Sequence, residues 1–205
     1  MPEKPRPIVG VAVFTISYLL VAVLGAVSTG SKEFLFYIAV MVILMAAVWA
    51  VHRRVNLTNP TLWALSLWGL LHMMGGLITV PEGWPVNGES RVLYNFWLIP
   101  DFLKYDHVVH GFGFGVTTWV CWQGMKSILR RTSASVTPTF GLMVLAWAAG
   151  LGFGAANEVI EFIAVLLVPN TNVGGYMNTG WDLVANLIGA VFAVVMIRLF
   201  DKRAL

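Results

Sequence analysis

The sequence has few charged residues and almost no cysteine. Charged side chains make up 11% of its 205 residues, whereas soluble domains average about a quarter. The single Cys121 excludes a disulfide framework within the chain. Walker, dinucleotide-binding and GxSxG motifs are also absent, so soluble nucleotide chemistry has no support.

Apolar residues dominate instead. They make up 58% of the chain, and the mean hydropathy is +0.78. A membrane-spanning helix needs about 20 apolar residues, so the chain has room for about six. Apolar runs bounded by charges, proline or glycine predict helices near residues 8–28, 34–51, 61–80, 103–125, 140–164 and 182–199. We therefore predict an all-α, polytopic transmembrane bundle that forms one domain over residues 1–205.

The basic residues predict the orientation of this bundle. When the loops are assigned alternately to two sides, ten of the thirteen basic residues fall on one side: Lys4, Arg6, Arg53, Arg54, Lys126, Arg130, Arg131, Arg198, Lys202 and Arg203. The positive-inside rule places this side, with both termini, in the cytoplasm of a multi-pass inner (plasma) membrane protein. The rule also explains the paired arginines without a nucleic-acid partner.

Acidic residues show the opposite bias and come with histidines. Three of the predicted helices each offer one polar face near the outer boundary. The fourth carries Asp106, His107 and His110, the fifth carries Asn157, Glu158 and Glu161, and the last carries Asp182, Asn186 and Gly189. At about 100° per residue the groups of each helix share one side. Gly113, Gly150 and Gly154 would let these helices pack closely, so we expect the polar faces to meet.

Carboxylates in hydrocarbon cost at least a few kcal/mol each, so a shared site needs a compensating charge. Imidazole combined with carboxylate suits Zn, Mn or Fe. We hypothesise that Asp106, His110, Glu158 and Glu161 bind such a metal. His107 or Asp182 would then carry protons and Asn186 would orient a ligand.

Other interpretations stay open for several of these residues. Asp106 and Asp182 are also typical of solvated acids at helix N-termini, whereas Glu158 and Glu161 lie inside an apolar run. His72 is either the floor of a cavity beneath His110 or a buried histidine bonded to a neighbouring helix. The aromatic residues of the loop 81–100 favour interfacial anchoring, with a lid over an outer cavity as the alternative.

The motifs YDHVVH, NEVIE and WDLVANLIGA, together with LHMMGGLITVPEGW, resemble the YjdF-like family of small polytopic inner-membrane proteins. Their order is more distantly similar to VanZ-like membrane proteins. The resemblance covers about residues 60–195 and implies polar residues at Asp106, His110, Glu158, Glu161, Asp182 and Asn186. The segment NVGGYMNTGWD departs from it, because it lacks the acid of a TQGD-like segment. No reaction follows from the resemblance.

Three functions remain in competition. The first is metal-dependent chemistry on an envelope lipid. The second is a proton- or cation-coupled small transporter, because intramembrane acids and histidines also build relays. The third is a structural membrane subunit that uses polar groups to join its helices.

Overall fold

The computed structural model describes residues 8–132, 135–169 and 171–201. Over these residues the chain forms six α-helices: α1 (Val9–Thr29), α2 (Lys32–Val55), α3 (Asn59–Leu77), α4 (Tyr105–Leu129), α5 (Phe140–Leu167) and α6 (Tyr176–Phe200). Between α3 and α4, the loop 78–104 holds a 3-10 turn, η1 (Leu93–Asn95), and a small antiparallel pair, β1 (Trp97–Ile99) and β2 (Leu103–Lys104). The predicted all-α membrane-type bundle is confirmed. Lys4, Arg6, Lys202 and Arg203 lie outside the described residues.

Local chemistry sets the helix ends. Gly30 ends α1 in the left-handed region at φ 65°, where glycine carries no steric penalty. Directly after it, the Ser31 hydroxyl accepts the Phe34 N–H and starts α2. Thr139 caps α5 in the same way, through the Leu142 N–H. The first two helices are therefore joined by a tight turn, which keeps them antiparallel.

Several predicted boundaries differ from the structure, and α2 and α4 each end four residues later than predicted, at Val55 and Leu129. Helix α6 begins at Tyr176, six residues before the predicted start at Asp182, because the polar stretch before Asp182 continues the helix rather than forming a loop. Helix α3 ends at Leu77 instead of residue 80. The residues that follow α3 bond to a later part of the loop 78–104. The Val80 N–H donates to the Arg91 carbonyl at 2.7 Å, and the Leu93 N–H donates to the Ile78 carbonyl at 2.9 Å.

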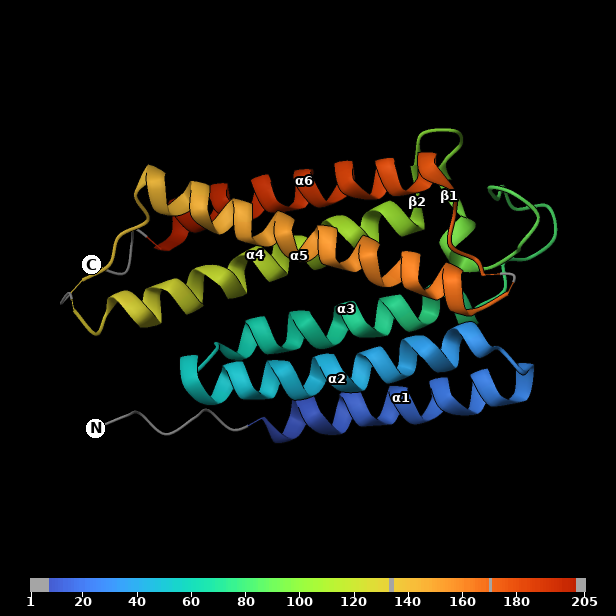
Figure 1. Cartoon of the computed structure of the whole chain (residues 1–205), viewed down its shortest axis with the longest axis horizontal. Coiled ribbons are helices and arrows are strands. Elements are labelled where there is room, and N and C mark those ends of the chain that lie inside the picture. The colour runs from blue at the N-terminus through green and yellow to red at the C-terminus, as the bar shows by residue number, and fades with distance from the viewer. Residues whose placement is uncertain (1–7, 133–134, 170, 202–205) are drawn as a thin grey trace.

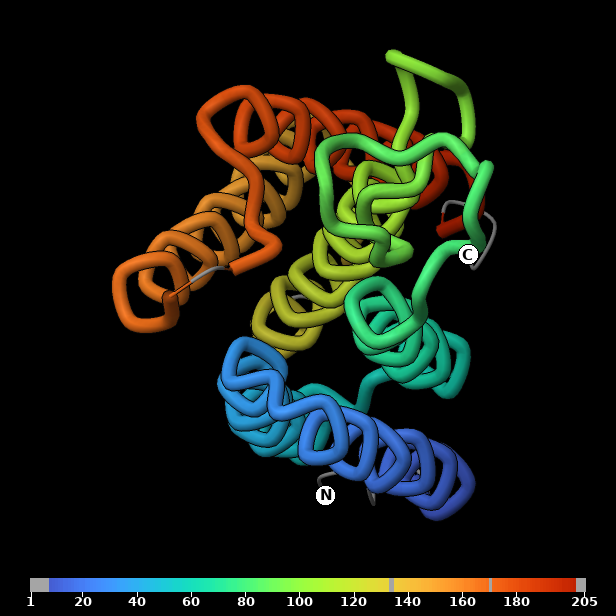
Figure 2. Tube along the Cα trace, turned by 90° about the vertical axis from the view of Figure 1, so that its right-hand side faces the viewer, coloured from blue at the N-terminus to red at the C-terminus, as the bar shows by residue number. Residues whose placement is uncertain are grey.

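Helix α4 is the central helix of the bundle. It lies between α5 and α6 on one side and α1 to α3 on the other (Figures 1 and 2). Glycines make its contacts close: a Cβ on Gly189 of α6 would lie 1.9 Å from the Gly111 carbonyl oxygen, and one on Gly150 of α5 would lie 1.9 Å from Thr118 Oγ1. Close packing of the last three helices, predicted from their small residues, is present.

Four of these helices, α1, α2, α5 and α6, are long and apolar enough to cross a membrane. Helices α3 and α4 have 19 and 25 residues, about 28 and 37 Å at the rise of an α-helix. The polar residues that make α4 less apolar, among them Asp106, His107 and His110, are buried inside the bundle. The other helices therefore cover the polar face of α4.

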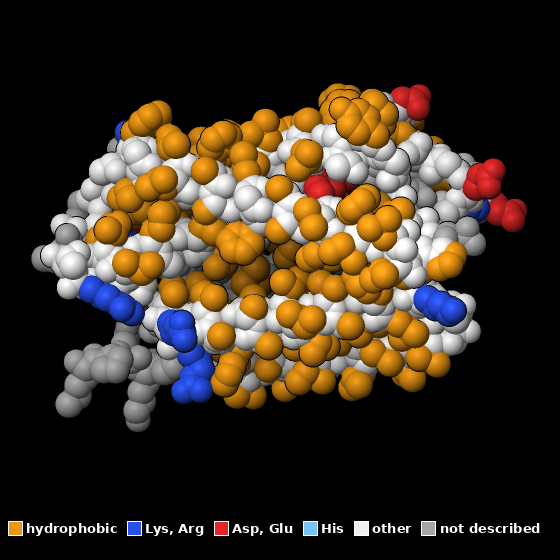
Figure 3. All heavy atoms as spheres, viewed as in Figure 1, with side chains coloured by type: hydrophobic (Ala, Val, Ile, Leu, Met, Phe, Trp, Pro, Cys, Tyr) orange, Lys and Arg blue, Asp and Glu red, His pale blue; other side chains and the backbone are white. Residues whose placement is uncertain are grey.

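Charged residues gather at the two ends of the bundle (Figure 3). One end, called the basic end below, carries Arg53, Arg54, Lys126, Arg130, Arg131 and Arg198 near the C-terminal ends of α2, α4 and α6. The opposite end carries Glu82, Glu89 and Asp101 in the loop 78–104 and is called the acidic end. Apolar side chains cover the flanks between them, as expected of a protein surrounded by lipid.

Candidate functional site

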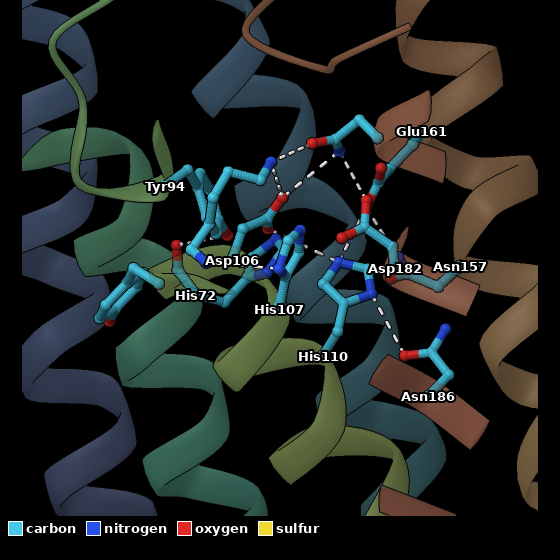
Figure 4. Close-up of polar contacts among 12 residues, drawn as sticks. His72, Tyr94, Asp106, His107, His110, Asn157, Glu161, Asp182 and Asn186 are labelled. Atoms are coloured by element: carbon cyan, nitrogen blue, oxygen red, sulfur yellow. Dashed lines mark hydrogen bonds and ion pairs between the residues drawn. The ribbon is translucent and has the colours of Figure 1, made fainter. Parts of the chain in front are cut away.

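A polar cluster lies inside the acidic half of the bundle, around His110 of α4. Its ring is 4% exposed. His110 Nε2 lies 3.7 Å from Asp106 Oδ1 and 3.6 Å from Glu161 Oε1, and Nδ1 lies 3.6 Å from Glu158 Oε1. Side chains from α4, α5 and α6 converge on this imidazole (Figure 4). The predicted meeting of the three polar faces is therefore present in the fold.

Helix α6 contributes two fully buried polar side chains to this cluster, Asp182 and Asn186. His110 Nδ1 lies 3.2 Å from Asn186 Oδ1, and since an amide oxygen only accepts, the imidazole donates through Nδ1–H. Its Nε2 faces Asp106 and Glu161. Gly154 makes room for this arrangement, because a Cβ there would lie 2.9 Å from Asn186 Nδ2.

Several buried oxygens of the cluster have no hydrogen-bond partner among the described residues. They are both carboxylate oxygens of Glu158 and Oδ1 of Asp182. A buried charge without a partner is costly, so these oxygens favour a bound cation. Asp106 lies in the first turn of α4, as the helix N-terminus reading has it, but neither acid is solvated, since Asp106 is 9% exposed and Asp182 is fully buried.

The cluster contains two overlapping sets of potential metal ligands. One consists of Asp106, His110 and Asp182, and the other of His110, Glu158 and Glu161. Within each set, one ligand atom per residue lies within 4.8 Å of the others. Three of the predicted ligands, His110, Glu158 and Glu161, thus form one set, and the fourth, Asp106, lies in the other set with Asp182.

Two residues of the cluster were not predicted from the sequence, Lys104 and Asn178. Lys104 is 3% exposed, and its ammonium lies 3.4 Å from Asp106 Oδ2 and also contacts Asn178 Oδ1. Asn178 Nδ2 donates to Asp182 Oδ2 at 2.5 Å. The spacing of four residues from Asn178 to Asp182 and again to Asn186 was a usable signal, but the late predicted start of α6 concealed it.

Asn157, His107 and His72 are predicted polar residues that lie at the edge of the cluster. Asn157 donates to Glu161 Oε1 at 2.7 Å and so holds that carboxylate in place. His107 turns away, because its Nδ1 accepts the Lys104 backbone N–H at 3.3 Å and its ring stacks on Trp181. His107 Nε2 is buried without a hydrogen-bond partner among the described residues.

His72 lies between two tyrosines, with its ring edge-on to Tyr37 and Tyr94. It lines a cavity of about 30 Å³ together with Asp106 and Glu161. The ring of His72 therefore lines a small cavity next to the cluster. At 30 Å³ this cavity holds about one water molecule.

The outer segments close over the cluster. The Tyr94 hydroxyl donates to the His72 carbonyl at 2.8 Å, and burial raises the pKa of Tyr94 well above its usual range, which keeps it a donor. On the other side, Glu33 accepts two hydrogen bonds from the backbone and side chain of Asn172, each 2.9 Å at its shortest. Ser90 donates to Asn172 Oδ1 at 2.6 Å. Tyr94 thus lines the cavity from the outer loop, and the choice between interfacial anchoring and a lid stays a prediction.

Comparison with known protein families agrees with this architecture. Residues 10–203 match the family described as "Predicted membrane protein (DUF2238)". The chain belongs to this family. No curated protein and no solved structure matches the chain. Membership of DUF2238 supports an integral membrane protein, and the chemistry of the cluster has to be argued from its geometry.

Proposed function

We propose that this DUF2238 protein is a multi-pass protein of the inner (plasma) membrane with a divalent metal centre at His110, Asp106, Glu158 and Glu161, and that the centre acts on an envelope lipid. Zn, Mn and Fe are the metals favoured by a single imidazole among carboxylates. The finer resemblance to YjdF-like and VanZ-like membrane proteins is part of the same proposal.

The spacing around His110 is the observation that carries the proposal. Its Nε2 lies 3.7 Å from Asp106 Oδ1 and 3.6 Å from Glu161 Oε1, whereas hydrogen bonds of this kind measure about 2.7 to 3.2 Å. Two ligands bound to one ion at about 2.1 Å are separated by about 3 to 3.5 Å. The separations are therefore closer to the edges of a coordination shell than to hydrogen bonds.

The tautomer of His110 supports the same conclusion. With Nδ1–H donating to Asn186 Oδ1, the neutral imidazole would offer its Nε2 lone pair to a metal, on the side of Asp106 and Glu161. Histidine ligands generally donate their other N–H to a fixed acceptor, which sets the ring orientation. Asn186 is therefore the orienting residue of the proposed centre.

A bound metal would act as a Lewis acid on a phosphoryl or carbonyl oxygen, or would generate hydroxide from bound water. Asp182 and His107 are the proposed proton carriers, because Asp182 Oδ1 and His107 Nε2 are buried without hydrogen-bond partners among the described residues. Asp182 belongs to the cluster itself, whereas His107 lies at its edge, so Asp182 is the first of the two to test.

Lipid is the proposed substrate class because the cluster reaches the flank of the bundle. The side chains of Glu158 and Glu161 are 9% and 13% exposed, on a helix whose neighbouring Val159, Phe162 and Ile163 face outward. An acidic side chain is visible through the apolar flank at α5 and α6 (Figure 3). The positive-inside rule puts this level of the bundle near the outer leaflet.

Metal analysis of the purified protein tests the proposal. Protein prepared in detergent without chelator should contain Zn, Mn or Fe, and the double variant Glu158→Gln/Glu161→Gln should lose it while remaining folded. Glu82→Gln/Glu89→Gln is the matched control, because both residues are exposed in the loop 78–104. Absence of metal, with no binding on addition, would refute the centre. Ion uptake by liposomes that contain the protein, measured under a pH gradient, distinguishes this proposal from the transporter hypothesis.

A further inference from the structure

A pocket of oxygen atoms lies beside His110, on the side nearest the acidic end. Asp106 Oδ2, Asn178 Oδ1 and Asp182 Oδ2 border it, and Asn178 links the two aspartates by donating to Asp182 Oδ2 at 2.5 Å and to Asp106 Oδ2 at 3.4 Å. Carboxylate and amide oxygens are the ligands that hard divalent cations prefer. The composition of the pocket is therefore suited to a cation.

A cation of the chain itself occupies this pocket. The Lys104 ammonium contacts Asp106 Oδ2 and Asn178 Oδ1. Lysine is almost never fully buried unless it is paired, yet Lys104 is 3% exposed. The burial is independent evidence that the oxygens attract positive charge strongly enough to hold a side chain that normally stays in water.

The pocket is not fully satisfied by the lysine. The ammonium pairs with Asp106, whereas Asp182 Oδ1 has no hydrogen-bond partner among the described residues although Asp182 is fully buried. Asp106 also serves both sides, because Oδ1 faces His110 Nε2 while Oδ2 faces Lys104. A carboxylate shared in this way is typical of centres with two adjacent cations.

We propose that this oxygen pocket is a second cation site, which Lys104 fills in place of a divalent ion. The inference rests on the proposed metal centre at His110 and specifies its occupancy. The native protein binds one divalent ion beside one ammonium group, and removal of the lysine opens a place for a second ion. Lys104 thereby sets the number of metal ions that the centre takes.

Lys104→Met tests this, with Lys32→Met as the matched control. Lys32 is exposed at the same end of the bundle, so both variants remove one positive charge there. Manganese is the probe, measured as Mn²⁺ bound per chain and by electron paramagnetic resonance. Wild type and Lys32→Met should bind one Mn²⁺ with the spectrum of an isolated ion. Lys104→Met should bind two, with the spectrum of a coupled pair, and bind the first about tenfold or more tightly because the competing charge is gone.

The outcomes separate this inference from the proposed function. If wild type and Lys104→Met both bind one isolated Mn²⁺ with equal affinity, the second site is refuted and the centre at His110 stands. If neither binds Mn²⁺, both are refuted. Should Lys104→Met unfold without metal, its melting temperature is measured during Mn²⁺ titration. Recovery by Mn²⁺ but not by NaCl of equal ionic strength supports the site, and failure to recover refutes it.

Discussion

Lys126 and Lys104 stand at opposite ends of α4, and the ammonium group of each faces an aspartate and helix α6. At the basic end, Lys126 Nζ lies 2.5 and 2.6 Å from the two oxygens of Asp201, and Trp122 Nε1 donates to the same carboxylate at 2.6 Å. At the acidic end, Lys104 Nζ lies 3.4 Å from Asp106 Oδ2. The first pair uses both oxygens of its aspartate.

The comparison distinguishes an ion pair that joins helices from an ion pair that belongs to the proposed metal site. The Lys126–Asp201 pair is complete, and around it Trp122, Met143, Ala146 and Ile197 form an apolar core. Around Lys104, by contrast, four carboxylates lie near one ammonium and one imidazole, and some of their oxygens are unpaired. Incomplete pairing in a buried region points to a ligand, whereas complete pairing points to stability.

Gly189→Ala should have the largest effect, because it disrupts both ends of the comparison together. A Cβ at this position would lie 1.9 Å from the Gly111 carbonyl oxygen, and backbone cannot yield as a side chain does. We expect a loss of about 2–3 kcal/mol in the free energy of unfolding, measured by thermal or denaturant unfolding in detergent. Gly180→Ala is the control on the same helix, since a Cβ there meets nothing within 4 Å. Equal stability of the two variants would contradict the close packing of α4 on α6.

Asp106→Asn should affect the acidic end alone. It keeps the shape of the side chain but removes the charge that faces both His110 and Lys104. We expect metal affinity to fall about a hundredfold, the upper range for changes around a metal site. Melting without metal should be lowered as well, because buried Lys104 loses its carboxylate partner, although weaker repulsion among the acids offsets part of this loss. Isothermal titration with Mn²⁺ and a melting curve measure the two effects, and a variant that loses stability but keeps its affinity would count against a metal site.

Lys126→Met should have the smallest effect, confined to the basic end. The side chains of Lys126 and Asp201 are 18% and 16% exposed, so solvent screens part of their attraction. We expect a loss of about 1 kcal/mol or less in unfolding free energy and unchanged metal content. Thermal unfolding and metal analysis of the same sample test both statements. A change in metal content would show that the two ends of α4 are coupled.

Much of the fold was predictable because a bilayer imposes a length on each apolar run. The same constraint makes the depths of Asp106, Glu158 and Asp182 comparable from the sequence alone. Helical spacing then placed Asp106 with His110, and Glu158 with Glu161, on common faces. These are local properties, and local properties are what a single sequence reveals.

The remainder depends on contacts between distant segments. Glu33 bonds to Asn172, and Lys104 reaches Asn178, across 139 and 74 residues. In the sequence, Lys104 also looks like an ordinary charged residue of a loop. No periodicity in the sequence distinguishes a lysine that folds inward from one that stays in water.

Helix α6 has one further consequence. Asn178, Asp182, Asn186 and Gly189 follow one another at intervals of four, four and three residues on a single stripe, where they hold the lysine, the acid cluster, the imidazole and the neighbouring backbone. A small rotation of this helix about its axis would shift all four residues at once. The geometry of the proposed centre therefore depends on the rotation of α6 about its axis. Any change that rotates α6 would alter the charges, the ligands and the helix packing of the proposed centre together.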